Sequence, residues 1–572
     1  MPTVIVRRPS SNSPALPVSP LLQRIYAARG VCSADQLDHR LQRLPLPSSL
    51  TGLAESLTLL ENALRQRQRI TIVADLDADG ATSCALAVRA LRALGAADVR
   101  YVVPNRFVHG YGLTPEIVAV AARDRPDLLI TVDNGISSHE GVRAAQALGM
   151  RVLITDHHLP GPSLPAADAL VNPNQPGDAF PCKQLAGVGV IFYVLLALRA
   201  RLRENGWFTL CGLPEPNMAQ FLDLAAVGTV ADVVSLAHAN RVLVEQGLRR
   251  IREGRCVPGI TALFHIAGRS MARASAADIA FQLGPRLNAA GRLADMSLSI
   301  DCLLCDDPVR ALELARELDR LNRERRVIET EMRAQALDNL EQQPLMDGEL
   351  PFGLCLFDPD WHPGVVGIVA GRIRERVHRP VIAFAPDNHP GQLRGSARSV
   401  PGLHIRDVLA TLDARQPGLI GRFGGHAAAA GLSLPATHLS AFQSAFDAEV
   451  RGQLRPEDLN GCLWSDGELE PADFSLETAE QLREAGPWGQ GFPEPVFDGV
   501  FEVTAHRIMK DQHLKLWLRP PGMKQPVEAV AFHRVGDFTP GVTRLHVAYR
   551  LDANEWRGER RLQLRVEHLE PA

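Results

Sequence analysis

Carboxylates and imidazoles gather in a few short stretches of the chain. They are Asp75, Asp77, Asp79, Asp133, Asp156, His157, His158 and Asp232. Carboxylates crowded into one place repel one another, and proteins relieve this repulsion with a shared proton or a divalent cation. The imidazoles favour the cation, because a mixed Asp/His set is more typical of Mn²⁺ than of Mg²⁺, which prefers six oxygens. We therefore predict a divalent-metal site, with Mn²⁺ preferred and Mg²⁺ as the alternative.

Predicted strands bring these residues together. Apolar runs with β-branched members at residues 70–74, 128–132 and 152–155 each end directly before one of the acidic stretches. Helical stretches between them indicate a parallel sheet, and the carboxyl ends of parallel strands share one crevice. Asp232 lies in a later helical section that can close over this crevice. Such a ligand set would hold two ions about 3.5–4 Å apart, with a bridging carboxylate, and would activate a water for phosphoester hydrolysis.

The first acidic stretch has other interpretations when it is taken alone. Aspartates are common in turns because they accept backbone hydrogen bonds. A calcium loop is excluded, because counting Asp75 as its first position puts Leu86 where the loop requires a glutamate. Three acidic groups at the ends of three successive strands favour chemistry over turn formation.

The composition is that of a large globular protein. The chain has 572 residues, 46% of them hydrophobic, which predicts about four domains. Its longest apolar run, residues 186–198, is shorter than the roughly 20 residues of a membrane-spanning helix, so we expect no membrane association. The first 20 residues lack the apolar stretch of a secretory signal, which indicates a cytoplasmic protein. Nine scattered cysteines indicate reduced thiols.

The order of predicted elements indicates a multidomain α/β chain. We expect an N-terminal tail and helical segment (1–50), a parallel α/β domain (51–235) and a helical section that completes the catalytic core (236–305). A charged stretch without glycine predicts one long linker helix (306–343). A smaller α/β domain (344–452) and a domain of five short strands (453–572) follow, and the latter fits an OB-type barrel.

The acidic stretches resemble the four motifs of the DHH phosphoesterase superfamily. The matching runs are residues 75–80, Val132-Asp133-Asn134-Gly135, Asp156-His157-His158 and Gly228-Thr229-Val230-Ala231-Asp232. Further runs at residues 284–292, 361–370, 396–399 and 424–426 are similar to those of its bacterial 5′→3′ exonucleases specific for single-stranded DNA. Leu76 stands where an aromatic residue is common and Ala397 where glycine is frequent, and neither change removes a ligand.

The resemblance implies roles for individual residues. The implied metal ligands are Asp75, Asp77, Asp79, Asp133, His157 and Asp232, and the implied catalytic residues are Asp133, His157 and His158, the last as a ligand or an acid–base group. The smaller α/β domain looks like the DHHA1 substrate domain. The implied substrate contacts are Arg106, Arg286, Asn288, Ser396, Arg398, Ser399, Gly424, Gly425 and His426. Guanidiniums and glycine backbone N–H groups suit a terminal 5′-phosphate.

The expected function is metal-dependent degradation of single-stranded DNA to 5′-mononucleotides in recombination and repair. Residues 505–572 carry 12 Lys and Arg against 8 Asp and Glu, which favours a barrel that follows a nucleic-acid backbone. The resemblance also implies a single-strand-binding protein and a repair helicase as partners, in the bacterial cytoplasm at the nucleoid. Two alternatives stay open: a phosphodiesterase for oligoribonucleotides or cyclic dinucleotides, and a non-catalytic DNA-binding scaffold.

Overall fold

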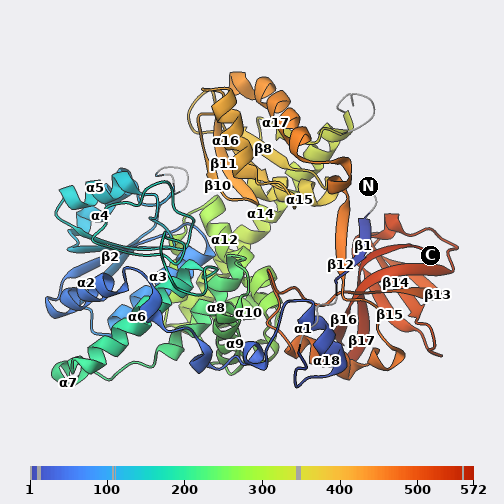
Figure 1. Ribbon diagram of the computed structural model, residues 1–572, viewed down its shortest axis with the longest axis horizontal. Helices are drawn as coiled ribbons and strands as arrows, with labels where there is room; N and C mark the ends of the chain where they lie inside the picture. The colour runs from blue at the N-terminus through green and yellow to red at the C-terminus, as the bar shows by residue number, and fades with distance from the viewer. Residues whose placement is uncertain (1–2, 10–13, 106–108, 110, 343–349, 557–558) are drawn as a thin grey trace. The chain divides into compact units, whose positions relative to one another are not determined.

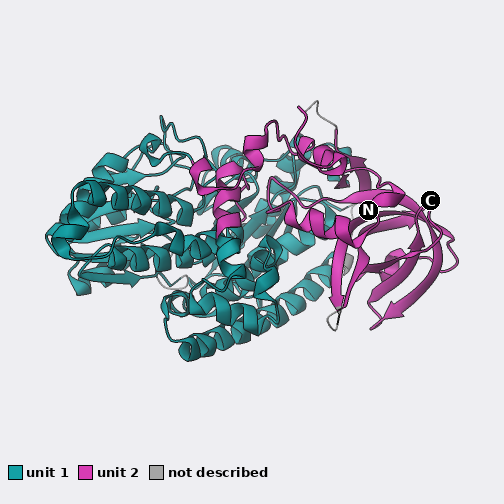
Figure 2. Ribbon diagram, turned by 90° about the horizontal axis from the view of Figure 1, so that it is seen from below, with its two compact units in different colours: residues 1, 45–232, 247–460 teal, residues 2–44, 233–246, 461–572 magenta. Residues whose placement is uncertain are grey.

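The chain folds into two compact units. The structure, a computed structural model, describes residues 3–9, 14–105, 109, 111–342, 350–556 and 559–572. The first unit comprises residues 45–232 and 247–460, and the second comprises residues 2–44, 233–246 and 461–572 (Figure 2). Helix α9 (His238–Arg252) is shared between the two units. The metal-ligand candidates and the smaller α/β domain therefore lie in one unit, and the barrel lies in the other.

A five-stranded parallel sheet forms the first domain of the first unit (Figure 1). Its order is β3-β2-β4-β5-β6, with β2 (Arg69–Ala74), β3 (Asp98–Val102), β4 (Leu128–Val132), β5 (Arg151–Thr155) and β6 (Ala169–Val171). Its helices are α2 (Leu53–Arg65), α3 (Ala78–Ala93), α4 (Pro115–Ala121), α5 (His139–Ala147) and α6 (Gly187–Glu204). Every residue of β4 is buried, as expected for a strand covered on both faces. Strands β2, β4 and β5 match the three predicted runs.

A helical section follows the sheet in the same unit. It contains α7 (Trp207–Cys211), α8 (Leu222–Ala231), α10 (Pro258–Ile266), α11 (Ala276–Asp278), the π-helix η7 (Ile279–Leu283), α12 (Gly284–Leu293), α13 (Ser297–Leu304) and α14 (Pro308–Gln342). The expected linker helix is α14, which has 35 residues and exposed Arg/Glu pairs such as Arg320 with Glu317 and Glu324. Within the described residues, no helix is long and apolar enough to cross a membrane.

The smaller α/β domain is built on a mixed sheet. Its order is β10-β11-β9-β8-β7, with β7 (Leu354–Phe357), β8 (Val381–Pro386), β9 (Gln392–Arg398), β10 (Arg422–Gly425) and β11 (Ala429–Pro435). Only β7 and β8 pair in parallel. Its helices are α15 (Val366–Val377), α16 (Ile405–Arg415) and α17 (Leu439–Gln453). The sequence predicted a smaller α/β domain over residues 344–452, and the structure adds the antiparallel pairing of β9, β11 and β10.

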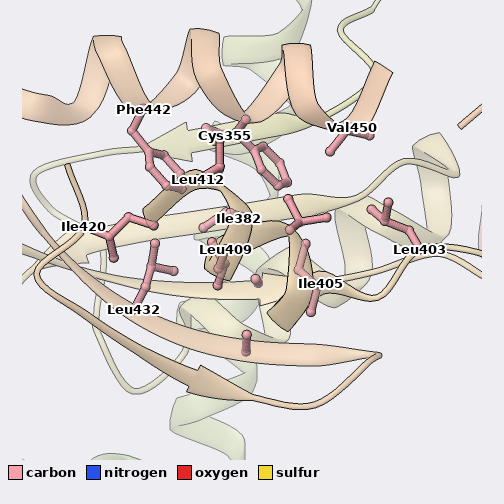
Figure 3. Packing of buried hydrophobic residues seen from close by; sticks show 14 of the residues in the cluster. Cys355, Ile382, Leu403, Ile405, Leu409, Leu412, Ile420, Leu432, Phe442 and Val450 are labelled. Atoms are coloured by element: carbon pink, nitrogen blue, oxygen red, sulfur yellow. The ribbon is translucent and has the colours of Figure 1, made fainter. Parts of the chain in front are cut away.

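Apolar side chains cover both faces of this sheet. Ile382 of β8 packs in one cluster with Phe442 and Val450 of α17 (Figure 3). The next residue along β8, Ala383, belongs to a second cluster that includes residues of α14 and α15. Because successive strand residues face opposite sides, β8 is buried on both faces. The linker helix α14 thus shares a core with this domain.

The second unit contains the predicted barrel. Strands β13 (Phe497–Met509), β14 (His513–Arg519), β15 (Val527–Ala531), β17 (Glu559–Pro571) and β16 (Arg544–Trp556) close in that order, which confirms the five-stranded expectation. Helices α1 (Pro20–Ala27) and α18 (Leu476–Glu484) belong to the same unit. The N-terminus differs from the expected tail, because β1 (Thr3–Arg7) pairs in parallel with β12 (Gly461–Ser465).

Candidate metal centre and phosphate cradle

The carboxyl ends of the parallel strands bring the predicted ligands together. Three overlapping sets have potential ligand atoms within 4.8 Å of one another: Asp133 with His157 and His158, Asp79 with His157 and Asp232, and Asp75 with Asp77 and Asp133. Asp75 follows β2, Asp133 follows β4 and His157 follows β5. Asp232 caps the C-terminus of α8, so the helical section supplies the last carboxylate. All six predicted ligands and His158 therefore share one site.

Unsatisfied polar atoms show that this site fits a cation. Asp75 Oδ1, Asp133 Oδ1 and His157 Nε2 are buried, and none has a hydrogen-bond partner among the residues that the structure describes. His157 Nε2 lies 3.1 Å from Asp133 Oδ1 and 3.5 Å from Asp232 Oδ2. Buried polar atoms without partners are costly, and a metal bound by them removes that cost. The mixed oxygen and nitrogen donors suit a divalent transition metal.

Charge repulsion dominates the electrostatics of the centre. Burial and the charge of Asp77 raise the pKa of Asp75 and of Asp79 to about 7. Burial and the charges of Asp79 and Asp77 raise the pKa of Asp232 to about 9. Burial lowers the pKa of His157 to about 4, so that its imidazole is neutral at pH 7. Neutral imidazole is the form that binds a metal.

Asp156 orients the two histidines without itself belonging to the ligand sets. Its Oδ1 accepts hydrogen bonds from the backbone N–H groups of His157 (2.7 Å) and His158 (3.1 Å) and is 2.8 Å from His158 Nδ1. Its Oδ2 accepts from the Ile136 N–H at 2.9 Å. Burial opposes a charged His158, but the bond to Asp156 outweighs it and raises the pKa of His158 to about 10. His158 is therefore a cation on the edge of the centre.

Asp79 is fixed by the backbone of a neighbouring helix. The N–H groups of Gly187 and Val188, at the start of α6, donate to its two oxygens at 2.6 and 3.0 Å. A Cβ at Gly187 would lie 2.5 Å from Asp133 Oδ1, so only glycine lets α6 approach both carboxylates. Helix N-termini favour anions. The start of α6 therefore holds Asp79 by hydrogen bonds and packs directly against Asp133.

The loop after β4 also has an uncommon conformation. Asp133 has φ 62°, in the left-handed region, where aspartate is one of the few tolerated residues. The next residue, Asn134, donates from its side-chain amide to the carbonyls of Val73 and Val132, both at 3.0 Å. These bonds hold the turn that directs Asp133 toward the other ligands.

A second polar cluster lies in the smaller α/β domain, and we call it the phosphate cradle. It comprises Ser396, Arg398, Gly424, Gly425 and His426. Ser396 pairs with Gly431 across β9 and β11, and Gly431 pairs with Gly424 across β11 and β10. Arg398 Nη1 donates to Ser396 Oγ at 3.0 Å. A Cβ at Gly367 in the first turn of α15 would lie 2.8 Å from that Oγ and 2.9 Å from Arg398 Nη2. A helix N-terminus and a guanidinium thus face the same place, as an oxyanion requires.

His426 connects this cradle electrostatically with the metal centre. Its Nδ1 accepts from the Ala428 N–H at 3.2 Å. Burial lowers its pKa, and the positive charges of Arg398 and His158 lower it further. A neutral His426 offers a ring N–H to a phosphate beside the guanidinium of Arg398.

The remaining predicted substrate residues have other partners in the structure. Arg286 is buried, and it donates to Asp319 of α14 at 2.9 Å and to the Gln282 carbonyl at 2.7 Å. Asn288 Oδ1 accepts from the Ala78 N–H of the metal loop at 2.9 Å. The Ser399 hydroxyl donates to the Leu403 carbonyl at 2.7 Å. Substrate contacts by these three residues stay predictions.

Arg106 lies outside the described residues. Asp156 and Asn134 stand in the acidic stretches of the sequence, but neither was assigned a role, and the backbone of Gly187 and Val188 was not foreseen at all. The two backbone donors give no signal, since every residue other than proline has an N–H.

Comparison with known proteins gives the class. The chain matches family models for the DHH family N-terminal domain over residues 69–229, the DHHA1 domain over residues 351–452 and the RecJ OB domain over residues 465–568. With the Asp/His centre at the strand ends, these matches define a DHH-type phosphoesterase that carries an OB domain.

Similarity to individual relatives shows the family to which the chain belongs. The chain is 52% identical to the single-stranded-DNA-specific exonuclease RecJ of Dickeya dadantii, over 100% of this chain and 99% of the relative. It is 49% identical to the Escherichia coli exonuclease of that name, over 99% and 98%. The crystal structure of RecJ with Mn²⁺ from Thermus thermophilus covers 97% of this chain and 76% of that chain, with 33% identity and a TM-score of 0.80. The Mg²⁺ complex covers 97% and 75%, with 31% identity and a TM-score of 0.74. The chain belongs to the RecJ family, and it is a hydrolase of the nuclease class.

Proposed function

We propose that the chain degrades single-stranded DNA from the 5′ end and releases 5′-mononucleotides, using the metal centre for hydrolysis and the phosphate cradle for the 5′-phosphate. The observation that carries the proposal is the set of buried, unpaired oxygen and nitrogen atoms at the strand ends, in the same unit as the arginine-containing cradle. The names of the relatives supply the substrate.

The metal ligands in this proposal are Asp75, Asp77, Asp79, Asp133, His157 and Asp232. Two divalent ions, Mn²⁺ or Mg²⁺, would supply activation of a water and neutralisation of the charge that develops on the phosphate. The chain's own contribution is position: Asp156 orients His157 and His158, and the N-terminus of α6 fixes Asp79.

His158 has a role of its own in the reaction. It is cationic at neutral pH and half-exposed at the edge of the centre, and Tyr111 Oη lies 3.2 Å from its Nε2. A proton held there can hydrogen-bond a phosphate oxygen or the leaving 3′-oxygen. We assign His158 to this contact, and Asp133 and His157 to the positioning of the reacting water.

The cradle sets the direction of degradation. Arg398, Ser396 and the first turn of α15 hold the terminal 5′-phosphate. Gly424 and Gly425 of the edge strand β10, which β11 separates from β9, and the following His426 contact it from the other side of β11. Holding the end of the strand places the first phosphodiester at the metals, which gives one nucleotide per cycle.

The barrel offers an outward face for the single strand. Along β14 the residues alternate, so that Leu514, Leu516 and Leu518 are buried while Lys515 and Trp517 face outward. The Lys515 ammonium lies 5.3 Å from the centre of the Trp517 ring, and Phe532 is 52% exposed. Tyr549 is fully buried and belongs to the core. Of these aromatics, Trp517 and Phe532 are the ones that can stack on bases.

Partners and location complete the proposal. A single-strand-binding protein and a repair helicase would supply the strand, and the work would take place in the bacterial cytoplasm at the nucleoid. The bacterial organisms of the relatives fit a bacterial cytoplasm, and the two partners rest on the family resemblance alone.

The two alternative functions have less support. A scaffold that had lost catalysis would lack ligands, and here every predicted ligand is present at one site. A phosphodiesterase for dinucleotides would have no use for a barrel matched by the RecJ OB model.

The test is digestion of an oligonucleotide labelled at either end, single-stranded or as a blunt duplex, with Mn²⁺, Mg²⁺ or chelator. We expect metal-dependent release of mononucleotides from the 5′ end of the single strand, and no release by Asp133→Ala. Binding without cleavage would support the scaffold, and cleavage of dinucleotides alone would support the small-substrate enzyme.

A further inference from the structure

A small cavity of about 220 Å³ lies within the second unit. Three segments that are distant in the sequence contribute to its lining: residues 29–36, residues 235–241 at the start of α9, and residues 491–492. The backbone joins two of these segments, because the Leu236 N–H donates to the Gln490 carbonyl at 2.7 Å. The volume is below that of pockets for drug-sized molecules, so the cavity suits one small ligand.

Two buried arginines line this cavity, and only one of them has a counterion. Arg29 donates from Nη1 and Nη2 to the two oxygens of Asp466, at 2.7 and 3.0 Å. Arg241 is 6% exposed, and its hydrogen bonds go to the carbonyls of Leu236 (2.8 Å) and Gln36 (3.0 Å). Among the described residues that line the cavity, none is Asp or Glu. Arg241 is therefore a buried cation without an ion-pair partner in the described part of the chain.

The guanidinium of Arg241 keeps donors for a ligand. It carries five N–H groups, and its Nε is buried with no hydrogen-bond partner within the residues that the structure describes. The Phe492 ring packs against the group, with Arg241 Cζ 4.2 Å from the ring centre, and so fixes its position. Burial lowers the pKa of Arg241 to about 10, so the group stays charged at neutral pH. A buried charge without a counterion is costly, and a bound anion would remove much of that cost.

The start of α9 supplies further donors to the same cavity. Ala237 and His238 line it, and α9, which has 15 residues, begins at His238. The first N–H groups of a helix have no partner within the helix, and a helix N-terminus favours anions. Ser235 also lines the cavity, and a Cβ at Gly491 would lie 2.1 Å from the Ser235 Oγ, so only glycine fits beside this hydroxyl. A guanidinium, a helix N-terminus and a hydroxyl are together the donors of an oxyanion site.

We propose that this cavity binds one small oxyanion, a phosphate or a carboxylate group, through Arg241, Ser235 and the first turn of α9. The bound anion would neutralise Arg241 and would join the three chain segments that line the cavity. The site is independent of the proposed function, because the metal centre and the phosphate cradle belong to the first unit.

Fluorine NMR tests the site directly. A 4-fluorophenylalanine in place of Phe492 in the full chain would report on the cavity, because that ring packs against Arg241. Sodium phosphate and sodium acetate would be titrated separately in chelator, with sodium chloride at matched ionic strength as the control. We expect a saturable change in chemical shift, and the oxyanion that binds more tightly identifies the class of ligand. A change that chloride reproduces, or no change with either oxyanion, would overturn the proposal.

Three variants show where the anion binds. Arg241→Gln should weaken binding about tenfold or more, because it removes the charge-assisted hydrogen bonds. Gln36→Glu keeps the size of a lining residue and supplies the missing carboxylate, so it should weaken binding without lowering the Tm in the absence of anion. Arg398→Ala alters the cradle alone and should leave the response at position 492 unchanged. Unchanged affinity in both Arg241→Gln and Gln36→Glu, or loss of the response in Arg398→Ala, would contradict the assignment.

Discussion

The metal centre and the phosphate cradle lie in one unit but differ in how far their residues are exposed. Asp79 and Asp133 are each 1% exposed, whereas Gly424, Gly425 and His426 are exposed. The ligands are held by the backbone N–H groups of α6 and by Asp156, while the glycines of the cradle leave a backbone open to an incoming anion. Hydrolysis needs metal-ligand atoms that stay at fixed positions. Binding of a strand end needs a surface that the DNA can reach.

The two regions also differ in charge. The centre concentrates carboxylates whose pKa values are raised by burial and mutual repulsion, and the cradle presents Arg398, whose pKa is lowered by burial. In the proposed function, the metal-free centre would repel a strand and the cradle would attract it. Bound divalent ions would reverse the first effect, so that both regions would engage one strand.

The largest effect is expected from a change in the metal centre. Asp133→Asn removes a charge needed to bind the metals, and kcat should fall on the order of 10³-fold or more. Its unpaired carboxylate is costly without metal, because burial and neighbouring aspartates raise its pKa. The variant should therefore melt at or above the temperature of the wild type in chelator. Lower stability together with lower activity would indicate misfolding rather than lost chemistry.

A change in the cradle should alter recognition rather than chemistry. Arg398→Ala removes a charge-assisted hydrogen bond, and KM for a 5′-phosphorylated strand should rise about 10- to 100-fold. The kcat should change much less. Arg376→Ala, an exposed arginine near the other end of α15, is the control. A fall in kcat with no change in KM would contradict the division between the two regions.

Asp156→Asn tests whether orientation of the histidines matters. The amide keeps the size of the carboxylate but has one acceptor oxygen, so it cannot accept both from the histidine groups at Oδ1 and from the Ile136 N–H at Oδ2. It also lacks the negative charge that raises the pKa of His158. Asp156 is a hydrogen-bond partner of the histidines rather than a ligand, and loss of such a partner should lower activity about tenfold. Metal titration should show weaker Mn²⁺ binding in the variant. Unchanged affinity and activity would show that Asp156 serves the fold alone.

Metal removal should destabilise the protein in a pH-dependent way. The folded pKa values of Asp75 and Asp79 are raised to about 7 and that of Asp232 to about 9, from 3.8. Between these values the folded state binds more protons than the unfolded state, so its stability falls as pH rises. The difference in Tm between Mn²⁺ and chelator should thus be larger at pH 8.5 than at pH 5.5, by a few degrees. A difference independent of pH would contradict the buried repulsion.

The sequence predicted the metal centre better than the cradle, for a physical reason. Each ligand follows an apolar run, and parallel topology alone brings strand ends together. Arg286 and Arg398 were equally good candidates for a phosphate, but tertiary contacts distinguish them, since Arg286 is paired with Asp319. No local pattern shows which arginine a distant aspartate will neutralise.

Local sequence patterns predict the fold only in part, for the same reason. Strands β2, β4 and β5 are continuous apolar runs with β-branched members, and they were predicted. The pairing of β1 with β12 joins segments about 450 residues apart, and the strands β9 to β11 contain serine, arginine and glycine that weaken their pattern. Long-range pairing and polar strands are visible only in the structure.

The most direct test of this division of labour is strand binding measured apart from cleavage. A 5′-phosphorylated and a 5′-hydroxyl oligonucleotide with uncleavable linkages would be titrated against the wild type, Asp133→Asn and Arg398→Ala with Mn²⁺. We predict that the wild type and Asp133→Asn prefer the 5′-phosphate and that Arg398→Ala has lost this preference. Retention of the preference by Arg398→Ala, or its loss in Asp133→Asn alone, would contradict the account.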